Sequence, residues 1–128
     1  MEIKSELHLQ SLVYQWFYNS FPELRIESER AKSPRCLMVH NFNNPRTKIQ
    51  GSKLSGAGLT KGIPDLMILK PSGRYSGMFI ELKYGNNKAE RDQIEVIDKL
   101  REVGYYCIIS NNFEEIKKEI NEYFKQDI

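Results

Sequence analysis

Three features are missing from the sequence: paired cysteines, long apolar runs and a phosphate-binding loop. Cys36 and Cys107 lie far apart and lack metal-ligand spacing, so we expect both to be reduced and structural. No apolar stretch is long enough for a membrane span, and the charged start is not followed by the apolar region of a secretory signal. We therefore expect a cytoplasmic protein without a membrane partner.

The pattern Gly-x-x-x-x-Gly-Lys-(Ser/Thr) does not occur, which argues against nucleotide hydrolysis by a P-loop. Repeats and low-complexity tracts are also missing. The 128 residues are 40% apolar and 28% charged, a balance that fits a folded chain and argues against disorder. We expect a single domain over residues 1–128.

Acidic residues are missing from one long segment. Between Arg30 and Pro64 there are seven basic residues and no acidic one, although the net charge of the whole chain is only +2. A basic segment of this kind suits a polyanion such as nucleic acid, and a solvated basic loop is an equally good explanation of the segment alone. Residues 46–62 are also rich in glycine, which predicts a loop that is mobile without substrate.

The stretch that follows, residues 62–83, combines two predicted strands with acidic and basic side chains. Its two apolar runs are joined by the turn-forming segment 71–77. In the second run, the side-chain period of two puts Met78, Ile80, Leu82 and Tyr84 on a core face and Phe79, Glu81 and Lys83 on the other. Asp65 would lie near Glu81 if the strands pair in the right register. Two such carboxylates repel each other unless a cation or proton lies between them, and Mg²⁺ would suit that position.

Hydrophobic periodicity predicts helices and strands on both sides of this pair. A first helix covers about residues 5–19, with Ser5 as N-cap, and a short strand covers residues 36–40. A helix follows over residues 88–103, with Asn87 and Glu90 as a capping box. Its predicted buried stripe is Ile94, Ile97, Leu100 and Val103. A strand over residues 105–110 and a helix from about Asn112 complete the chain.

The order of these elements predicts an α/β fold. The strand, helix and strand over residues 78–110 form a unit that requires parallel pairing with a right-handed crossover. The hairpin before it is antiparallel. We therefore predict a mixed central sheet flanked by helices.

Pro64-Asp65 and, after an interval of fifteen residues, Glu81-Leu82-Lys83 resemble the Pro-Asp…(Asp/Glu)-x-Lys signature of restriction-endonuclease-like nucleases. The wider context, Lys61-Gly62-Ile63-Pro64-Asp65-Leu66, Phe79-Ile80-Glu81-Leu82-Lys83, Gln93 and an opening Ser5-Glu6…Gln10, resembles the VRR-NUC nuclease family. The resemblance covers roughly the first hundred residues or more. It is to the stand-alone, single-domain type of phages and bacteria.

The resemblance implies an αβββαβ core with an extra C-terminal helix, and a metal-dependent DNA endonuclease that hydrolyses phosphodiester bonds. Asp65, Glu81 and the backbone carbonyl of Leu82 would hold one or two Mg²⁺ or Mn²⁺ ions, with Glu6 as an auxiliary ligand. Lys83 would orient the attacking water and stabilise the pentacovalent state, with Gln93 as a further orienting group. The expected DNA contacts are Arg46, Lys48, Lys53 and Lys61, with a minor contact from His40.

Several of these residues also have plain structural explanations. Glu6 in a first helical turn complements the helix dipole. Gln93 fits a half-exposed helix position, and His40 fits a packed or hydrogen-bonded one. Glu81 and Lys83 alone fit a solvent-facing ion pair worth about 0–1 kcal/mol.

Other functions stay open at this point. The chain would also suit a non-cleaving nucleic-acid-binding accessory protein of the same fold, or a module that docks its basic segment on an acidic protein partner. For the nuclease, the resemblance implies a homodimer that selects four-way (Holliday) junctions or other branched DNA, because symmetric cutting of two strands calls for two copies. The 14 aromatic residues, clustered at Trp16, Phe17, Tyr18 and Phe21 and at Tyr105 and Tyr106, favour a dimer interface as well.

Overall fold

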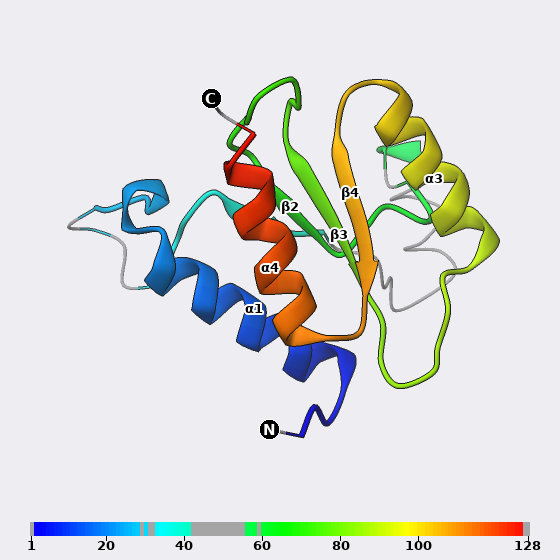
Figure 1. The fold of residues 1–128 in the computed structure, drawn as a ribbon, viewed down its shortest axis with the longest axis horizontal. Coiled ribbons are helices and arrows are strands. Elements are labelled where there is room, and N and C mark those ends of the chain that lie inside the picture. The colour runs from blue at the N-terminus through cyan, green and yellow to red at the C-terminus, as the bar shows by residue number, and fades with distance from the viewer. Residues whose placement is uncertain (1, 29, 31–32, 42–55, 59, 127–128) are drawn as a thin grey trace.

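The computed structural model describes residues 2–28, 30, 33–41, 56–58 and 60–126. Figure 1 shows a sheet with helices on both faces. The elements in chain order are α1 (Glu6–Ser20), the 3₁₀ turn η1 (Pro22–Leu24), β1 (Met38–His40), β2 (Leu66–Ile68), β3 (Met78–Leu82), α3 (Arg91–Glu102), β4 (Tyr106–Ser110) and α4 (Phe113–Phe124). This order confirms the predicted αβββαβ core with an additional C-terminal helix.

The four strands form one mixed sheet in the order β1-β2-β3-β4. β1 pairs antiparallel with β2, and β2 pairs antiparallel with β3. β3 and β4 are parallel, with Met78 opposite Tyr106 and Leu82 opposite Ser110. The predicted hairpin and the predicted parallel unit are therefore both confirmed.

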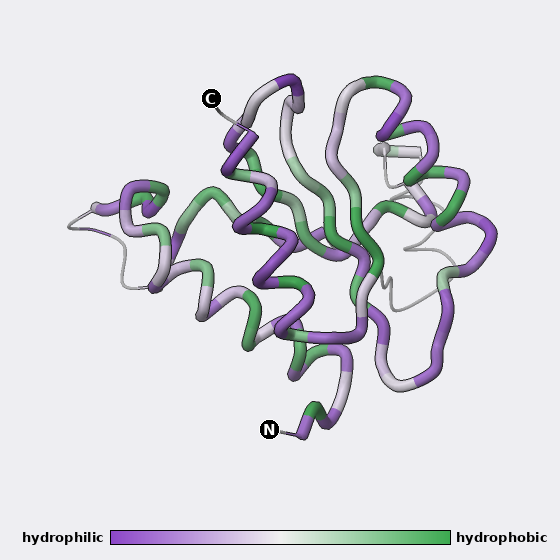
Figure 2. Tube along the Cα trace, in the orientation of Figure 1, coloured by the Kyte–Doolittle hydropathy of each residue, from purple (hydrophilic) through white to green (hydrophobic). Residues whose placement is uncertain are grey.

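Two helical layers cover the sheet (Figure 1). On one face, α1 and α4 pack on a large core that includes Leu66, Ile80 and Leu82. On the other face, α3 packs through Ile97 on a smaller cluster with Phe79 and Cys107. Figure 2 shows the apolar residues running along the strands and alternating with polar ones along α4. In the part of the chain described, no helix has both the length and the apolar character needed to cross a bilayer.

The first and last helices begin where the sequence predicts. The hydroxyl of Ser5 accepts a hydrogen bond from the backbone N–H of His8 at 3.0 Å and caps α1. The side chain of Asn112 accepts one from the N–H of Glu115 at 2.9 Å and caps α4. Each cap satisfies a backbone donor that has no partner within the helix.

The predicted start of the third helix is wrong. α3 begins at Arg91, and its N-cap is Glu90 rather than Asn87. After β3 the chain makes a turn in which Gly85 has φ +59° and the N–H of Asn87 donates to the carbonyl of Tyr84 at 3.1 Å. Residues 87–90 follow this turn without helical structure, and the backbone of Glu90 is extended. The capping box is therefore made by Glu90 and Gln93.

The predicted buried faces of α3 and β3 also need correction. Ile97 is 1% exposed, but Ile94 is 46% and Val103 56% exposed, because α3 meets the sheet only along the line of Ile97 and Leu100. In β3, Phe79 is buried under α3 and does not face solvent. Tyr84 is exposed because the strand has already ended at Leu82.

The clustered aromatic residues pack within the protein itself. Phe17 is buried, and Trp16, Tyr18, Phe21 and Tyr106 lie partly buried against the same core, while Tyr105 packs on the cluster under α3. Phe21 contacts the ring of Phe17 at a centroid distance of 4.9 Å. This packing accounts for much of the aromatic surface, so the clusters alone do not indicate a dimer interface, and the homodimer stays a prediction.

The corrected burial of α3 makes a prediction about stability. Ile97→Ala should lower the free energy of unfolding by about 2–4 kcal/mol, because it leaves a cavity between the helix and the sheet. Ile94→Ala on the same helix should cost less than about 1 kcal/mol, since its side chain is already half in water. Urea denaturation followed by circular dichroism measures both. Equal losses would contradict this packing.

Candidate active site

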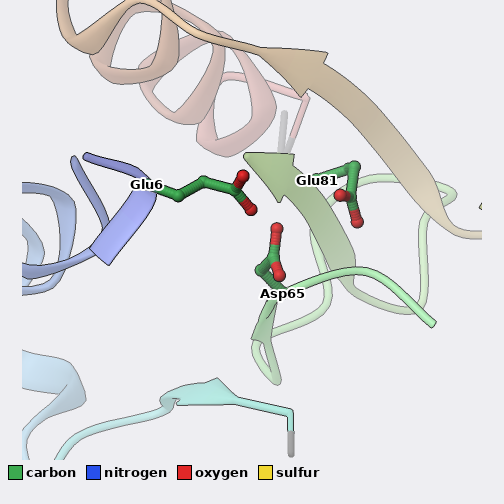
Figure 3. A group of neighbouring side chains, drawn as sticks. All are labelled: Glu6, Asp65 and Glu81. Carbon is green, nitrogen blue, oxygen red and sulfur yellow. The ribbon is translucent and has the colours of Figure 1, made fainter. Parts of the chain in front are cut away.

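Three carboxylates from three different parts of the chain converge at one end of the sheet (Figure 3). Glu6 is the first residue of α1, Asp65 directly precedes β2, and Glu81 lies in β3. One oxygen of each carboxylate lies within 4.8 Å of those of the other two. Asp65 lies 59 positions after Glu6 in the sequence, and Glu81 lies further still. Only the folding of the chain therefore brings the three side chains into one site.

The hairpin register places Asp65 beside Glu81. Leu66 lies opposite Ile80 in the antiparallel pair, and continuing that register sets Asp65 opposite Glu81. An Asp65 carboxylate oxygen accepts a hydrogen bond from the backbone N–H of Leu82 at 2.8 Å. One oxygen of Asp65 is therefore fixed to the strand that carries Glu81.

Asn41, directly after β1, holds the backbone of Pro64 and Asp65 in place. Its backbone N–H donates to the carbonyl of Asp65 and its side-chain amide donates to the carbonyl of Pro64, both at 2.8 Å. Asn41 is not among the predicted site residues. Its signal in the sequence is the polar pair His40-Asn41, which directly follows the predicted strand.

Glu81 and Lys83 form a buried ion pair. The ammonium of Lys83 lies 3.2 Å from Glu81 Oε2, and the two side chains are 11% and 1% exposed. The solvent-facing pair considered from the sequence is therefore wrong. Because the pair is largely withheld from water, its geometry is far more constrained than that of a surface ion pair.

Gln93 connects this pair to the start of α3. Its amide nitrogen donates to Glu81 Oε2 at 3.0 Å. Its amide oxygen accepts from Lys83 Nζ and from the backbone N–H of Glu90, each at 2.8 Å. One side chain thus caps the helix and fixes both charged groups. Gln93 therefore combines the helix position and the orienting contact that the sequence left as alternatives.

Gly62 packs directly against the same helical turn. Its φ is +92°, and a Cβ at this position would lie 2.5 Å from the backbone oxygen of Asp92. Only glycine fits both the conformation and the space. The glycine of the Lys61-Gly62-Ile63-Pro64-Asp65 motif therefore anchors the segment that carries Asp65 to the turn that carries Gln93.

Burial favours protonation of the three acids, and the charge of Asp65 adds to this effect at Glu81 and Glu6. Burial, together with the charge of Asp65, raises the pKa of Glu81 from its ordinary 4.5 to about 7, although Lys83 acts in the opposite direction. Burial also raises the pKa of Asp65 against the hydrogen bond from Leu82, and it raises the pKa of Glu6 with help from Asp65. A single lysine does not balance three carboxylates, so the site favours an added positive charge.

The donor set fits a hard divalent cation. Glu81 Oε1 is buried and has no hydrogen-bond partner among the described residues, while Oε2 receives both donors. A buried polar atom is rarely left without a partner. Carboxylate oxygens are the ligands that Mg²⁺ and Mn²⁺ prefer. Glu6, Asp65 and Glu81 are therefore the residues that would hold such an ion.

The remaining predicted residues lie around this centre or outside the described part of the chain. His40 is exposed at the end of β1, where it lines a groove of about 240 Å³ with Gln10 and Tyr14. Lys61 pairs with Asp92 at 3.0 Å, next to the start of α3. Arg46, Lys48 and Lys53, and most of the segment predicted to be mobile, lie outside the described residues. The carbonyl of Leu82 as a ligand stays a prediction.

Comparisons with known proteins agree with this geometry. The family model of the VRR-NUC domain matches residues 3–111. The fold is similar to a solved structure named "VRR_NUC domain protein", with a TM-score of 0.72 and 27% sequence identity, over 98% of this chain and 92% of that one. No curated protein sequence matches the chain. All residues of the acidic site and its Lys83–Gln93 support lie within the matched range.

The raised pKa of Glu81 predicts how stability depends on pH and on metal. With chelator, the thermal unfolding temperature should fall as pH rises from about 4.5 to about 7, because the folded state retains a proton that the unfolded state releases. Excess Mg²⁺ competes with that proton, so its stabilising effect should be small near pH 5.5 and large near pH 8.

Thermal unfolding with Mg²⁺ and with chelator across this pH range measures both trends. Glu81→Gln is the control, because it removes the titrating group and should flatten both curves. A stabilisation by Mg²⁺ that is independent of pH would contradict competition at this site.

Proposed function

The chain belongs to the VRR-NUC domain family, and we propose that it is a metal-dependent nuclease that hydrolyses phosphodiester bonds in DNA. The observation that carries the proposal is the convergence of Glu6, Asp65 and Glu81, with a buried Glu81 oxygen that has no partner among the described residues. Such a site would hold a cation, and a phosphodiester is the anionic substrate that a cation of this kind would activate.

Asp65, Glu81 and Glu6, with the Leu82 carbonyl, would hold one or two Mg²⁺ or Mn²⁺ ions. Bound there, the metal supplies a water of lowered pKa and neutralises charge on the scissile phosphate. The chain itself supplies the fixed geometry: Leu82 N–H orients Asp65, and Asn41 holds the segment that carries it.

Lys83 and Gln93 have distinct roles in this proposal. Lys83 carries a charge that is already held 3.2 Å from Glu81 Oε2, where it would orient the attacking water and stabilise the pentacovalent phosphate. Gln93 acts as a positioning residue, because its amide bonds to both members of the pair. Preorganised charges of this kind stabilise a transition state without reorganising during the reaction.

A DNA-binding protein that does not cut is the less favoured alternative. A protein of this fold that does not cut would be expected to lack one of the acids or the lysine. Here the three acids and Lys83 are all present and lie close together. Arg46, Lys48, Lys53 and Lys61 are the proposed phosphate contacts, with His40 at the α1 side of the site.

Substitutions at the acids and the lysine test the chemistry. Asp65→Asn and Glu81→Gln should each lower the cleavage rate by more than about 100-fold, and Gln93→Leu by about 10–100-fold, because metal ligands and their orienting partners both control activity. Lys83→Met should also lower the rate strongly while keeping the thermal stabilisation by Mn²⁺. Single-turnover cleavage of labelled DNA with Mg²⁺, with Mn²⁺ and with chelator measures these effects.

Lys99→Met is the matched control, since Lys99 is an exposed lysine of α3 paired only with Glu102 among the described residues. It should cut at the wild-type rate. Wild-type rates for Asp65→Asn and Glu81→Gln would exclude this site as the catalytic centre.

We also propose that the protein acts on branched DNA as a homodimer. One site cuts one strand, so a four-way junction needs two copies related by a twofold axis for symmetric cutting. Light scattering after size exclusion of the complex with junction DNA should give a protein mass of twice 15.0 kDa once the mass of the DNA is subtracted. Cleavage should be faster on the junction than on a linear duplex of equal length. A monomer mass with equal rates would leave a strand-nicking enzyme without structural preference.

A further inference from the structure

A second cavity adjoins the acidic site on the α3 side of the sheet. It has a volume of about 430 Å³, and Lys83 forms part of its wall. Ile94 of α3 and Ile109 of β4 contribute aliphatic surface, and Asn87, Lys88 and Asn111 contribute polar groups. The cavity falls within the range of about 300–1,000 Å³ that is usual for ligand pockets.

The register of the sheet explains why aliphatic surface is uncovered here. In the parallel pair, Glu81 lies opposite Ile109, so the two side chains stand on the same face as neighbours. α3 covers the preceding pair, Phe79 and Cys107, through Ile97. Because α3 begins only at Arg91, Ile109 stays 37% exposed beside a proposed metal ligand. The half-exposed Ile94 faces the same cavity.

We infer that this pocket receives the nucleobase of a nucleotide next to the scissile phosphate. This inference rests on the proposed nuclease function, because Lys83 is the residue shared by the pocket and the site. Aliphatic walls suit the flat face of a base, which enzymes acting on extruded nucleotides commonly hold between apolar side chains. Any base has such a face, so the contact needs no particular sequence.

The charged residues around the pocket bear on where a phosphate can lie. Lys83 is already paired with Glu81, and the carboxylate of Glu115 on the pocket wall repels a phosphate. Lys88 is exposed at the pocket and makes no ion pair within the described residues, so its ammonium is free for the backbone of the same strand. The base would thus enter the pocket while the phosphates stay between Lys88 and the acidic site.

The amide groups provide hydrogen bonds for the edge of the base. The amide nitrogen of Asn111 already donates to the carbonyl of Gly85 at 2.7 Å, which directs its oxygen as an acceptor. The side chain of Asn87 has no hydrogen bond among the described residues. It can therefore both donate and accept.

This pocket gives a physical reason for structure selectivity. A paired base must leave the duplex stack to enter it, and an unpaired base at a branch or mismatch has less to lose. DNA with an unpaired nucleotide beside the cleaved bond should therefore be cut faster than fully paired DNA. The preference arises from one nucleotide and does not depend on a second copy of the protein.

The test combines an abasic nucleotide in the DNA with a polar substitution in the pocket. An abasic nucleotide is moved one step at a time across the cleavage position. At one position next to the cut, wild-type cleavage should fall about tenfold, the scale of losing one base contact. Ile94→Asn should cut intact DNA about tenfold more slowly and lose most of the abasic penalty. Val103→Asn, at an exposed aliphatic residue that caps the far end of α3 and does not line the pocket, should keep the wild-type pattern.

Binding separates failure of the pocket from failure of the nuclease. Fluorescence anisotropy with the same DNA in Ca²⁺ should show the abasic penalty in wild type and Val103→Asn, and little of it in Ile94→Asn. Absence of cleavage with this binding pattern would reject the nuclease and keep the base pocket. An equal penalty in all three proteins, no penalty at any position, or no binding would overturn the pocket.

Discussion

Mutual repulsion among three carboxylates is the constraint on which the rest of the structure depends. Glu6, Asp65 and Glu81 bring oxygens within 4.8 Å of one another at a place where Glu81 is withheld from water. Burial, together with the charge of Asp65, raises the pKa of Glu81 to about 7. The surrounding contacts act against the repulsion: Leu82 N–H holds Asp65, while Lys83 and Gln93 hold Glu81. The fold therefore maintains a geometry that favours a bound cation over solvent.

Most of the fold could be predicted because its signals are local. The caps at Ser5 and Asn112 and the period of two in β3 each follow from a few neighbouring residues. Which helix covers a strand face depends on tertiary packing, and the alternation of residues along the strand does not predict it. Alternation separates Phe79 and Glu81 from Ile80, but it does not show that α3 lies over them. For the same reason, the apolar residues of α3 did not reveal that Ile94 and Val103 stay exposed.

The site was predictable to the extent that its residues belong to a motif. Asp65, Glu81 and Lys83 come together through one hairpin, which the sequence predicts without fixing its register. The contacts that hold them come from distant segments: Asn41 from the end of β1 and Gly62 from close packing against Asp92. A glycine in a motif can be noted from sequence, but its reason, a Cβ 2.5 Å from a backbone oxygen, requires coordinates. Gln93 likewise has a helix-capping role that sequence alone assigned to Asn87 and Glu90.

The late start of α3 connects the corrected helix boundary to the pocket beside the acidic site. Had the helix begun at residue 88, its first turn would include Lys88, which now lies in the non-helical segment between the turn at Gly85 and α3. That segment instead leaves Ile94 and Ile109 uncovered beside Glu81 and places Asn87 and Lys88 at the same cavity. Gln93 at the N3 position then does two things at once, capping the shortened helix and orienting the ion pair. The position at which α3 begins thus sets both the contacts of Gln93 in the acidic site and the exposed aliphatic surface next to that site.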